Sequence, residues 1–168
     1  MPVRSKRRVY LSGGMEYARS EGEDWRRKTE AWLKKELSHL SFNPNTASVR
    51  FLAKKGYSNS AFRALKSRNL LEYQRIVSQI VKRDTAEIVQ NASYVICNWD
   101  RSAERGAGTK GEVTIAKLAR KPVYVVTRIR PENIPGWILG CTTQLFSSFD
   151  DLKLFLKRKY FRNAKEGS

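Results

Sequence analysis

Cysteine is scarce in this sequence, and its two copies stand alone. Cys97 and Cys141 match neither the closely spaced set of a disulfide framework nor the paired spacing of a zinc site. We therefore expect two free thiols. We also expect the protein to use no metal ion and no organic cofactor.

Long hydrophobic runs are also missing. No stretch approaches the roughly 20 apolar residues that a membrane-spanning helix needs, and the basic residues 1–10 lack the apolar segment of a secretion signal. These absences predict a cytoplasmic protein without a membrane partner. A chain of 168 residues with 40% hydrophobic and 29% charged residues suits a single globular domain with a hydrophobic core.

Acidic residues are few compared with basic ones. The 16 Asp and Glu against 33 Lys and Arg give a formal net charge of +17, which predicts attraction to anions. Residues 46–83 include nine basic residues and a single acidic one, Glu72. Further basic clusters lie at the termini, which we expect to be mobile. Three interpretations stay open: a solvated surface, a site for a phosphate-bearing small substrate, and a surface that binds nucleic acid.

Strand and helix patterns alternate along the chain, which predicts a parallel sheet with right-handed crossovers. We expect an α/β fold with one domain over residues 1–168, a doubly wound flavodoxin-like or Rossmann-like sheet of about five mainly parallel strands, and helices on both faces. Residues 46 to about 60 lack clear periodicity and suggest a loop or insertion over the core, and we expect a basic insertion over about 46–70. The expected strands are 9–11, 40–42, 92–98, 122–127 and 143–146; the expected helices are 22–38, 61–91, 113–119 and one from 148; turns are expected at 43–45 and 131–140.

The first predicted helix has an apolar face and a basic face. Its core face is expected to carry the apolar residues Trp25, Trp32, Leu33 and Leu37. The opposite, solvent face is expected to carry Arg26, Arg27, Lys34 and Lys35.

One carboxylate stands out at the end of a glycine-rich connection. Residues 106–112, Gly-Ala-Gly-Thr-Lys-Gly-Glu, join an apolar strand to an amphipathic helix and place Glu112 at the helix start. Glycines let backbone approach a ligand, and a helix N-terminus favours negative charge, so we expect Glu112 to be an ionised nucleophile directed into a crevice. The alternative is structural: Thr109 caps the helix, and Glu112 completes a capping box without chemistry.

Four short segments carry a wider pattern. They read VYLSGG at 9–14, FNP at 42–44, DTAEI running into ASYVI between 84 and 96, and GTKGE running into KPV between 108 and 123. In order and spacing they resemble the nucleoside 2-deoxyribosyltransferase superfamily, which also contains the nucleoside 5′-monophosphate N-glycosidases. The resemblance covers roughly residues 8–127 and excludes the basic insertion.

The resemblance implies roles for three side chains. Glu112 matches the carboxylate that attacks the anomeric carbon of the sugar, Tyr10 the tyrosine that orients it, and Asp84 the aspartate near the sugar hydroxyls and leaving base. Breaking an N-glycosidic bond builds positive charge on the sugar, which a carboxylate stabilises, and the departing base needs a proton. Contacts with the substrate are expected from the residues at the carboxyl ends of the strands and the glycine-rich connection: Ser12, Gly13, Gly14, Asn98, Trp99, Gly108 and Thr109.

Each of these roles has a structural alternative. Tyr10 also fits a packed core tyrosine, and Asp84 also fits a surface ion pair with Arg83 or Lys82. The glycines also fit turns without any ligand. Trp99 is a candidate for stacking on a base if it is exposed beside the strand end.

The sequence also departs from the family pattern. Transferases of the family often carry an aspartate six residues before the nucleophile, where this chain has Gly106; Glu104 is a substitute or a solvated surface group. We therefore expect hydrolysis of the N-glycosidic bond rather than base exchange, and the abundant Lys and Arg suit a substrate with a 5′-phosphate. The resemblance implies a homo-oligomer. The alternative function is an inactive nucleotide- or nucleic-acid-binding module of the same fold.

Overall fold

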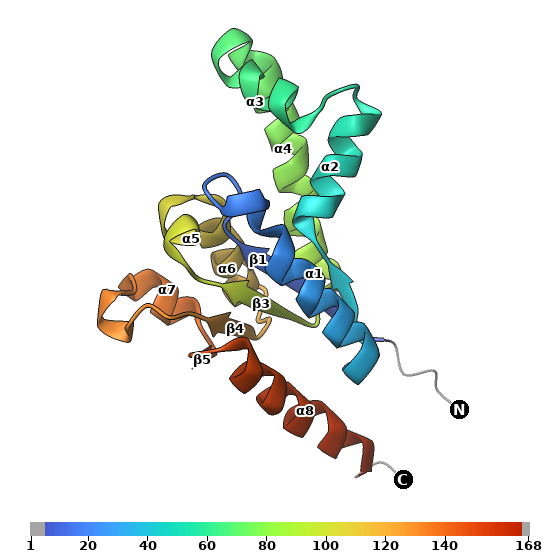
Figure 1. The fold of residues 1–168 in the computed structure, drawn as a ribbon, viewed down its shortest axis with the longest axis vertical. Helices are drawn as coiled ribbons and strands as arrows, with labels where there is room; N and C mark the ends of the chain where they lie inside the picture. The colour runs from blue at the N-terminus through green and yellow to red at the C-terminus, as the bar shows by residue number, and fades with distance from the viewer. Residues whose placement is uncertain (1–5, 166–168) are drawn as a thin grey trace.

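Five parallel strands form the centre of the protein (Figure 1). The computed structural model describes residues 6–165, with side chains to residue 160. The strand order is β2-β1-β3-β4-β5, so the order reverses between β1 and β3, and the predicted doubly wound α/β fold is confirmed. The strands are β1 (Arg8–Gly13), β2 (Leu40–Phe42), β3 (Tyr94–Asn98), β4 (Val123–Val126) and β5 (Gln144–Phe146).

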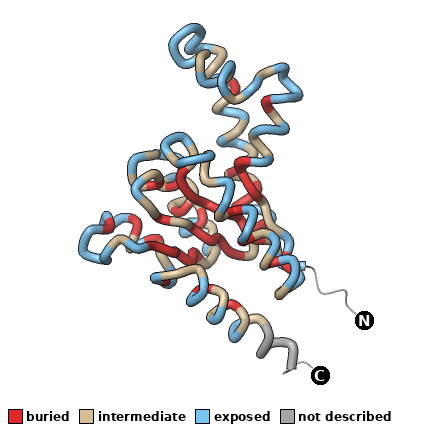
Figure 2. The backbone as a smooth tube through the Cα atoms, in the orientation of Figure 1, coloured by how far each residue is buried: buried red, intermediate tan, exposed pale blue. Residues whose placement is uncertain are grey.

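Helices cover both faces of this sheet, and the buried residues gather between the layers (Figure 2). Side chains alternate along each strand, so Tyr94 and Ile96 pack on one face with Leu33 and Leu152, while Val95 packs on the other. One face is covered by α1 (Glu23–Trp32), with the π-helical turn Leu33–Leu37, and by α8 (Phe149–Lys165). The other is covered by the end of α4 (Leu70–Ala86), the following π-helical turn Glu87–Asn91, α6 (Gly108–Leu118) and α7 (Gly136–Cys141); the short α5 (Arg101–Arg105) follows β3.

The loop predicted from residue 46 to about residue 60 is wrong for most of its length, because most of this segment is helical. The helices are α2 (Pro44–Lys54) and α3 (Asn59–Arg68), which stand out from the sheet together with the first part of α4 (Figure 1). The expected turn at 43–45 is the start of α2, where the side chain of Asn43 accepts hydrogen bonds from the backbone N–H groups of Asn45 and Thr46. The inward face of α2 carries polar Asn45 as well as apolar Leu52. The apolar periodicity that predicts a helix is therefore weak in this part of the sequence.

Two further predictions need correction. The segment 131–140 holds a 3-10 turn, Pro131–Asn133, and most of α7 rather than turns alone. The predicted mobile termini are partly ordered, since Arg8 lies in β1 and residues 157–159 lie in α8; residues 1–5 and 166–168 lie outside the described part. Among the described residues, the helices are all too short or too polar to cross a bilayer.

Candidate active site

Two hydroxyl groups on β1 hold the carboxylate of Glu112. Tyr10 and Ser12 are two residues apart on the strand, so their side chains leave the same face of the sheet, toward α6. The Tyr10 hydroxyl donates a hydrogen bond to Oε1 of Glu112 at 2.8 Å, and the Ser12 hydroxyl donates one to Oε2 at 2.5 Å. Both carboxylate oxygens are therefore held by donors, which gives Glu112 one orientation.

The ring of Tyr10 is itself held in place. It is fully buried and stacks on Phe42 of β2, with ring centroids 5.4 Å apart. Tyr10 is thus a packed core residue whose hydroxyl is used by Glu112. Burial, and then the charges of Glu112 and Asp84, raise the pKa of Tyr10, so its phenol remains a hydrogen-bond donor.

The capping-box alternative for Glu112 is wrong. Helix α6 begins at Gly108, its N-cap residue Ala107 makes no side-chain capping bond, and Glu112 is already the fifth residue. Thr109 is buried within the first turn instead of capping it. Because both oxygens of Glu112 accept from side chains of β1, the carboxylate belongs to the strand edge and not to its own helix terminus.

The environment of Glu112 makes its carboxyl group a weak acid. Burial raises the pKa of Glu112 to about 7 from its usual 4.5, and the hydrogen bonds from Ser12 and Tyr10 only partly oppose this. The expectation of an ionised Glu112 therefore holds only in part at neutral pH, because a carboxyl group with a pKa of about 7 is ionised in about half of the molecules there. A carboxyl group with a pKa near neutrality is typical of catalytic sites.

Asp84 lies in the last turn of α4 and lines the same cavity as Glu112. It is 9% exposed and pairs with Arg83 at 2.7 Å, so the predicted ion pair exists but is largely buried instead of solvated. Burial raises the pKa of Asp84, and Arg83 offsets part of that shift. The Tyr10 hydroxyl also lowers the pKa of Asp84, and the charge of Asp84 raises that of Glu112, so the three predicted side chains interact electrostatically.

Arg26 is buried near the end of β1, although its charge predicted a position on the solvent face of the first helix. It is fully buried, and its guanidinium donates hydrogen bonds to five backbone carbonyls. These belong to Leu11, Gly13, Gly14, Glu21 and Gly22. Arg26 therefore ties the end of β1 to the start of α1, and the seven-residue spacing from Arg26 to buried Leu33 was the signal for its inward position.

The glycines of the predicted site have different roles. A Cβ atom on Gly14 would lie 2.0 Å from Oγ of Ser102, and one on Gly13 would lie 2.8 Å from Trp25, so both glycines allow close packing within the protein. Gly108 differs, because a Cβ atom there would meet nothing within 4 Å and the residue lines the cavity.

The carboxylate of Glu112 opens onto a cavity of about 530 Å³. The loop after β1, helices α2 to α4 and the start of α6 surround it. Its walls are largely apolar, and include Val49, Leu52, Phe62, Val77, Ile80 and Ile115. Its charged lining residues are Glu16, Glu21, Asp84, Glu112 and Arg63. Because Arg63 is paired with Glu21, no unpaired Lys or Arg among the described residues lines this cavity.

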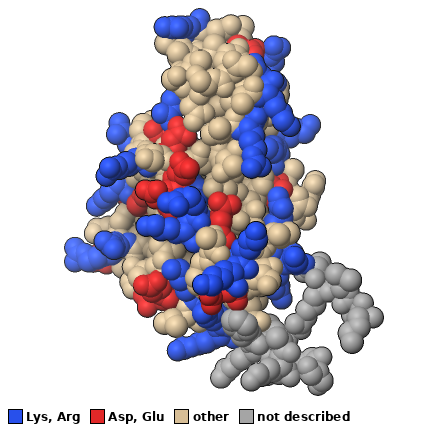
Figure 3. All heavy atoms as spheres, turned by 45° about the vertical axis from the view of Figure 1, so that its right-hand side comes forward, with Lys and Arg blue, Asp and Glu red and all other residues tan. Residues whose placement is uncertain are grey.

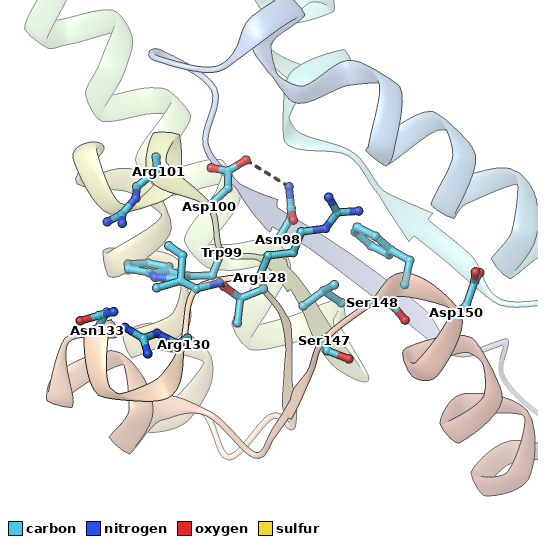
Figure 4. Close-up of a pocket in the computed structure, with 14 residues that line it drawn as sticks. Asn98, Trp99, Asp100, Arg101, Arg128, Arg130, Asn133, Ser147, Ser148 and Asp150 are labelled. Atoms are coloured by element: carbon cyan, nitrogen blue, oxygen red, sulfur yellow. Dashed lines mark hydrogen bonds between the residues drawn. The ribbon is translucent and has the colours of Figure 1, made fainter.

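A second cavity, of about 730 Å³, lies at the carboxyl ends of β3, β4 and β5 (Figure 4). Asn98 lines it and donates to Asp100 at 3.3 Å. Trp99 also borders it but is fully buried, so the prediction of an exposed Trp99 that stacks on a base is wrong. Figure 4 shows Arg128 and Arg130 pointing apart rather than toward one point. Of the predicted site residues, Asp84, Gly108 and Glu112 line the first cavity, and Asn98 and Trp99 line the second. The others line neither of these two cavities: Tyr10, Ser12, Gly13, Gly14 and Thr109.

No known protein family matches the sequence, and no curated protein matches it either.

Proposed function

We propose that this protein cleaves the N-glycosidic bond of a nucleoside or nucleotide, with Glu112 as the nucleophile. The observation that carries the proposal is the double hydrogen bond from Tyr10 and Ser12, which presents one carboxylate in a fixed orientation to a cavity. The second acid, Asp84, lines the same cavity. This is the arrangement that the resemblance to the nucleoside 2-deoxyribosyltransferase superfamily implies.

The reaction follows the logic of two carboxyl groups in glycoside hydrolysis. An oxygen of ionised Glu112 attacks the anomeric carbon C1′, and the bond from C1′ to the base nitrogen breaks with its electron pair on the base. Asp84 donates a proton to the departing base. Water then attacks C1′ and gives a proton to Asp84, the ester bond to Glu112 breaks, and the free sugar leaves.

Hydrolysis is favoured over transfer to a second base. Gly106 occupies the position six residues before Glu112 at which the family's transferases often carry an aspartate. The neighbouring Glu104 pairs with Arg101 at 2.6 Å and is not part of the cavity wall. Among the described residues, the segment that contains Glu104 and Gly106 therefore places no carboxyl group in the cavity that could replace this aspartate and bind an incoming base.

The cavity lining favours a nucleoside over a nucleoside 5′-monophosphate. A phosphate group is held in proteins by Arg, Lys or clustered backbone N–H groups. Within the part of the chain that the structure describes, four carboxyl side chains line the cavity, and its only basic side chain, Arg63, is already paired with Glu21. The positive charge that suggested a phosphorylated substrate lies elsewhere on the molecule.

Release of free base from defined substrates tests the proposal. The purified protein is incubated with 2′-deoxyribonucleosides, ribonucleosides and their 5′-monophosphates, with and without a second base, and free and exchanged bases are separated by chromatography. We expect free base from at least one nucleoside, loss of that activity in Glu112→Gln, and slow cleavage in Asp84→Asn. Glu104→Gln is the matched control on the neighbouring segment and keeps activity.

Two results would contradict the proposal. One is the absence of free base with every substrate under conditions in which the protein is folded. The other is full activity in Glu112→Gln, which would place the chemistry on another group. Preference for 5′-monophosphates would leave the reaction standing and overturn only the conclusion about the phosphate.

A further inference from the structure

The positive charge of this protein is separated from its acidic cavity. Among residues 6–165, Arg63 is the only basic residue that lines the cavity containing Glu112. In contrast, residues 46–83, which form α2, α3 and most of α4, carry nine Lys and Arg against Glu72. A net charge of +17 therefore needs an explanation outside the candidate active site.

Five of these basic side chains have no carboxylate partner within the described part of the chain. Four others are paired: Arg63 with Glu21, Lys66 with Glu16, Arg75 with Glu72 and Arg83 with Asp84. The remaining five are all exposed, and we call helices α2 to α4 with these five side chains the basic projection. They are Arg50, Lys54, Lys55, Arg68 and Lys82.

The arrangement of the helices directs several of these charges away from the cavity. On α2, Arg50 and Lys54 are one turn apart and lie opposite Leu52, which is buried and lines the cavity. On α4, Lys82 lies opposite Ile80, another cavity residue. Helices α2 and α3 and the first part of α4 stand clear of the sheet (Figure 1), and Figure 3 shows Lys and Arg gathered along one side of this part with few acidic groups among them.

Helix-end stabilisation explains only part of this charge. Lys54 and Arg68 lie in the last turns of α2 and α3. A cation there interacts favourably with the helix dipole and stabilises the helix by roughly 0.3–1 kcal/mol. Arg50 and Lys82 lie inside their helices and gain nothing comparable. Unpaired charges of one sign on one projection repel each other, and a polyanion removes that repulsion.

We propose that the basic projection binds the phosphate backbone of nucleic acid. Exposed Lys and Arg on a raised helical surface suit contact with successive phosphates, which needs no base-specific groups. Binding is therefore independent of sequence and falls steeply as salt rises. The surface is separate from Glu112, so this proposal stands or falls independently of the glycosidase proposal.

Salt-dependent binding to labelled oligonucleotides tests this proposal. Duplex DNA, single-stranded DNA and single-stranded RNA of mixed sequence are titrated with the full chain between about 50 and about 200 mM salt. A basic-projection variant changes Arg50, Lys54, Lys55, Arg68 and Lys82 to Gln. A matched control changes five other exposed basic residues without carboxylate partners in the described part: Lys28, Lys34, Lys35, Lys117 and Arg158. Both variants lose the same charge, and thermal unfolding confirms that each is folded.

We expect the wild type to bind at least one of the nucleic acids. In the basic-projection variant the plot of log affinity against log salt should be less steep than in the wild type, by about 0.9 for each duplex phosphate contact that is lost. The control variant should keep most of the affinity and slope. Equal weakening of both variants would show general charge attraction and overturn the proposal. So would absence of binding at low salt, or binding to acidic lipid vesicles without binding to any nucleic acid. The three oligonucleotides distinguish DNA from RNA and paired from single strands.

Discussion

Tyr10 and Glu112 lie 102 residues apart in the chain, yet the phenol of one donates a hydrogen bond to the carboxylate of the other at 2.8 Å. The contact joins the first strand of the sheet to a helix that follows the third, across the point at which the strand order reverses. Ligands of doubly wound sheets bind at that point, beyond the carboxyl ends of the strands. The fold itself therefore assembles the candidate nucleophile and its orienting group.

The raised pKa of Glu112 predicts a specific pH dependence of stability. Because the pKa is about 7 in the folded protein and 4.5 for an ordinary Glu, the folded state binds the proton more tightly than the unfolded state does. The stabilising effect is complete below about pH 4.5 and disappears as pH rises through about 7, which costs ~2–3 kcal/mol in free energy of unfolding. We expect Glu112→Gln to remove this dependence.

Urea unfolding at about pH 5 and about pH 8 measures the effect. At each pH, the free energy of unfolding of the wild type is subtracted from that of Glu112→Gln. This difference should be larger at about pH 8 than at about pH 5 by ~2–3 kcal/mol, whether it is positive or negative at about pH 5. Glu104→Gln, which removes an outer ion pair, is the control and should show no such change. If the free energy of unfolding changed with pH in the same way in the wild type and in Glu112→Gln, the raised pKa of Glu112 would be contradicted.

Removal of the hydroxyls that hold Glu112 predicts a shift in the pH profile of catalysis. The hydrogen bonds of Tyr10 and Ser12 lower the pKa of Glu112, so Tyr10→Phe or Ser12→Ala should move the acid limb of kcat/KM from about 7 to higher pH. The loss of orientation should also reduce kcat/KM by on the order of 10- to 100-fold. Steady-state kinetics across pH on the nucleoside that the wild type cleaves provide the measurement.

Tyr124→Phe is a matched control for that experiment. Tyr124 is another fully buried tyrosine of the sheet, on the opposite face from Tyr10, and its hydroxyl has no hydrogen-bond partner in the described structure. Its removal should leave the acid limb unchanged. If Tyr10→Phe also left the limb unchanged, the hydrogen bond to Glu112 would have no part in the titration.

The fold was predictable from sequence wherever apolar periodicity reflects burial. The central strands β1, β3 and β4 were found because continuous runs such as Val123–Val126 are buried on both faces. The edge strands β2 and β5 were also found, although they are partly exposed. Helix α2 was missed for the opposite reason, since polar Asn45 lies on its inward face and Asn43 and Pro44 serve both turns and helix starts. Hydrophobic patterns cannot reveal a helix whose buried face is polar.

The candidate site was predictable only in part. Glu112 stands out from its glycine-rich connection, Tyr10 and Asp84 are implied by the resemblance to the nucleoside 2-deoxyribosyltransferase superfamily, and the structure brings the three together. The hydrogen bond of Ser12 and the burial of Arg26 depend on which way side chains face after folding, and charge was a misleading guide to the position of Arg26. Only the seven-residue spacing from Arg26 to buried Leu33 distinguished this arginine from a solvated one in the sequence.

Arg26 is expected to be far more important for stability than its neighbour Arg27. Arg26→Met leaves five carbonyls around the β1 end without their donor, which should destabilise the protein by ~3–5 kcal/mol. Arg26→Lys should recover little, because one ammonium cannot reproduce the planar fork. Arg27→Met removes only an exposed contact with Asp24, so its effect should stay within ~0.5 kcal/mol. Denaturant unfolding of the three variants tests this, and similar values for Arg26→Met and Arg27→Met would contradict it.

Alanine at Gly14 and at Gly108 should separate packing from substrate space. A Cβ atom at Gly14 lies 2.0 Å from Oγ of Ser102 and 2.7 Å from the backbone nitrogen of Ala103, so Gly14→Ala should cost ~1–3 kcal/mol in stability. At Gly108 the added methyl meets no protein atom within 4 Å but enters the cavity wall, so Gly108→Ala should leave stability unchanged and raise KM for the nucleoside. Thermal unfolding and KM are measured for both variants. Unchanged KM in Gly108→Ala would show that the substrate does not approach the start of α6, whereas equal stability loss in both would contradict the assignment of Gly14 to packing.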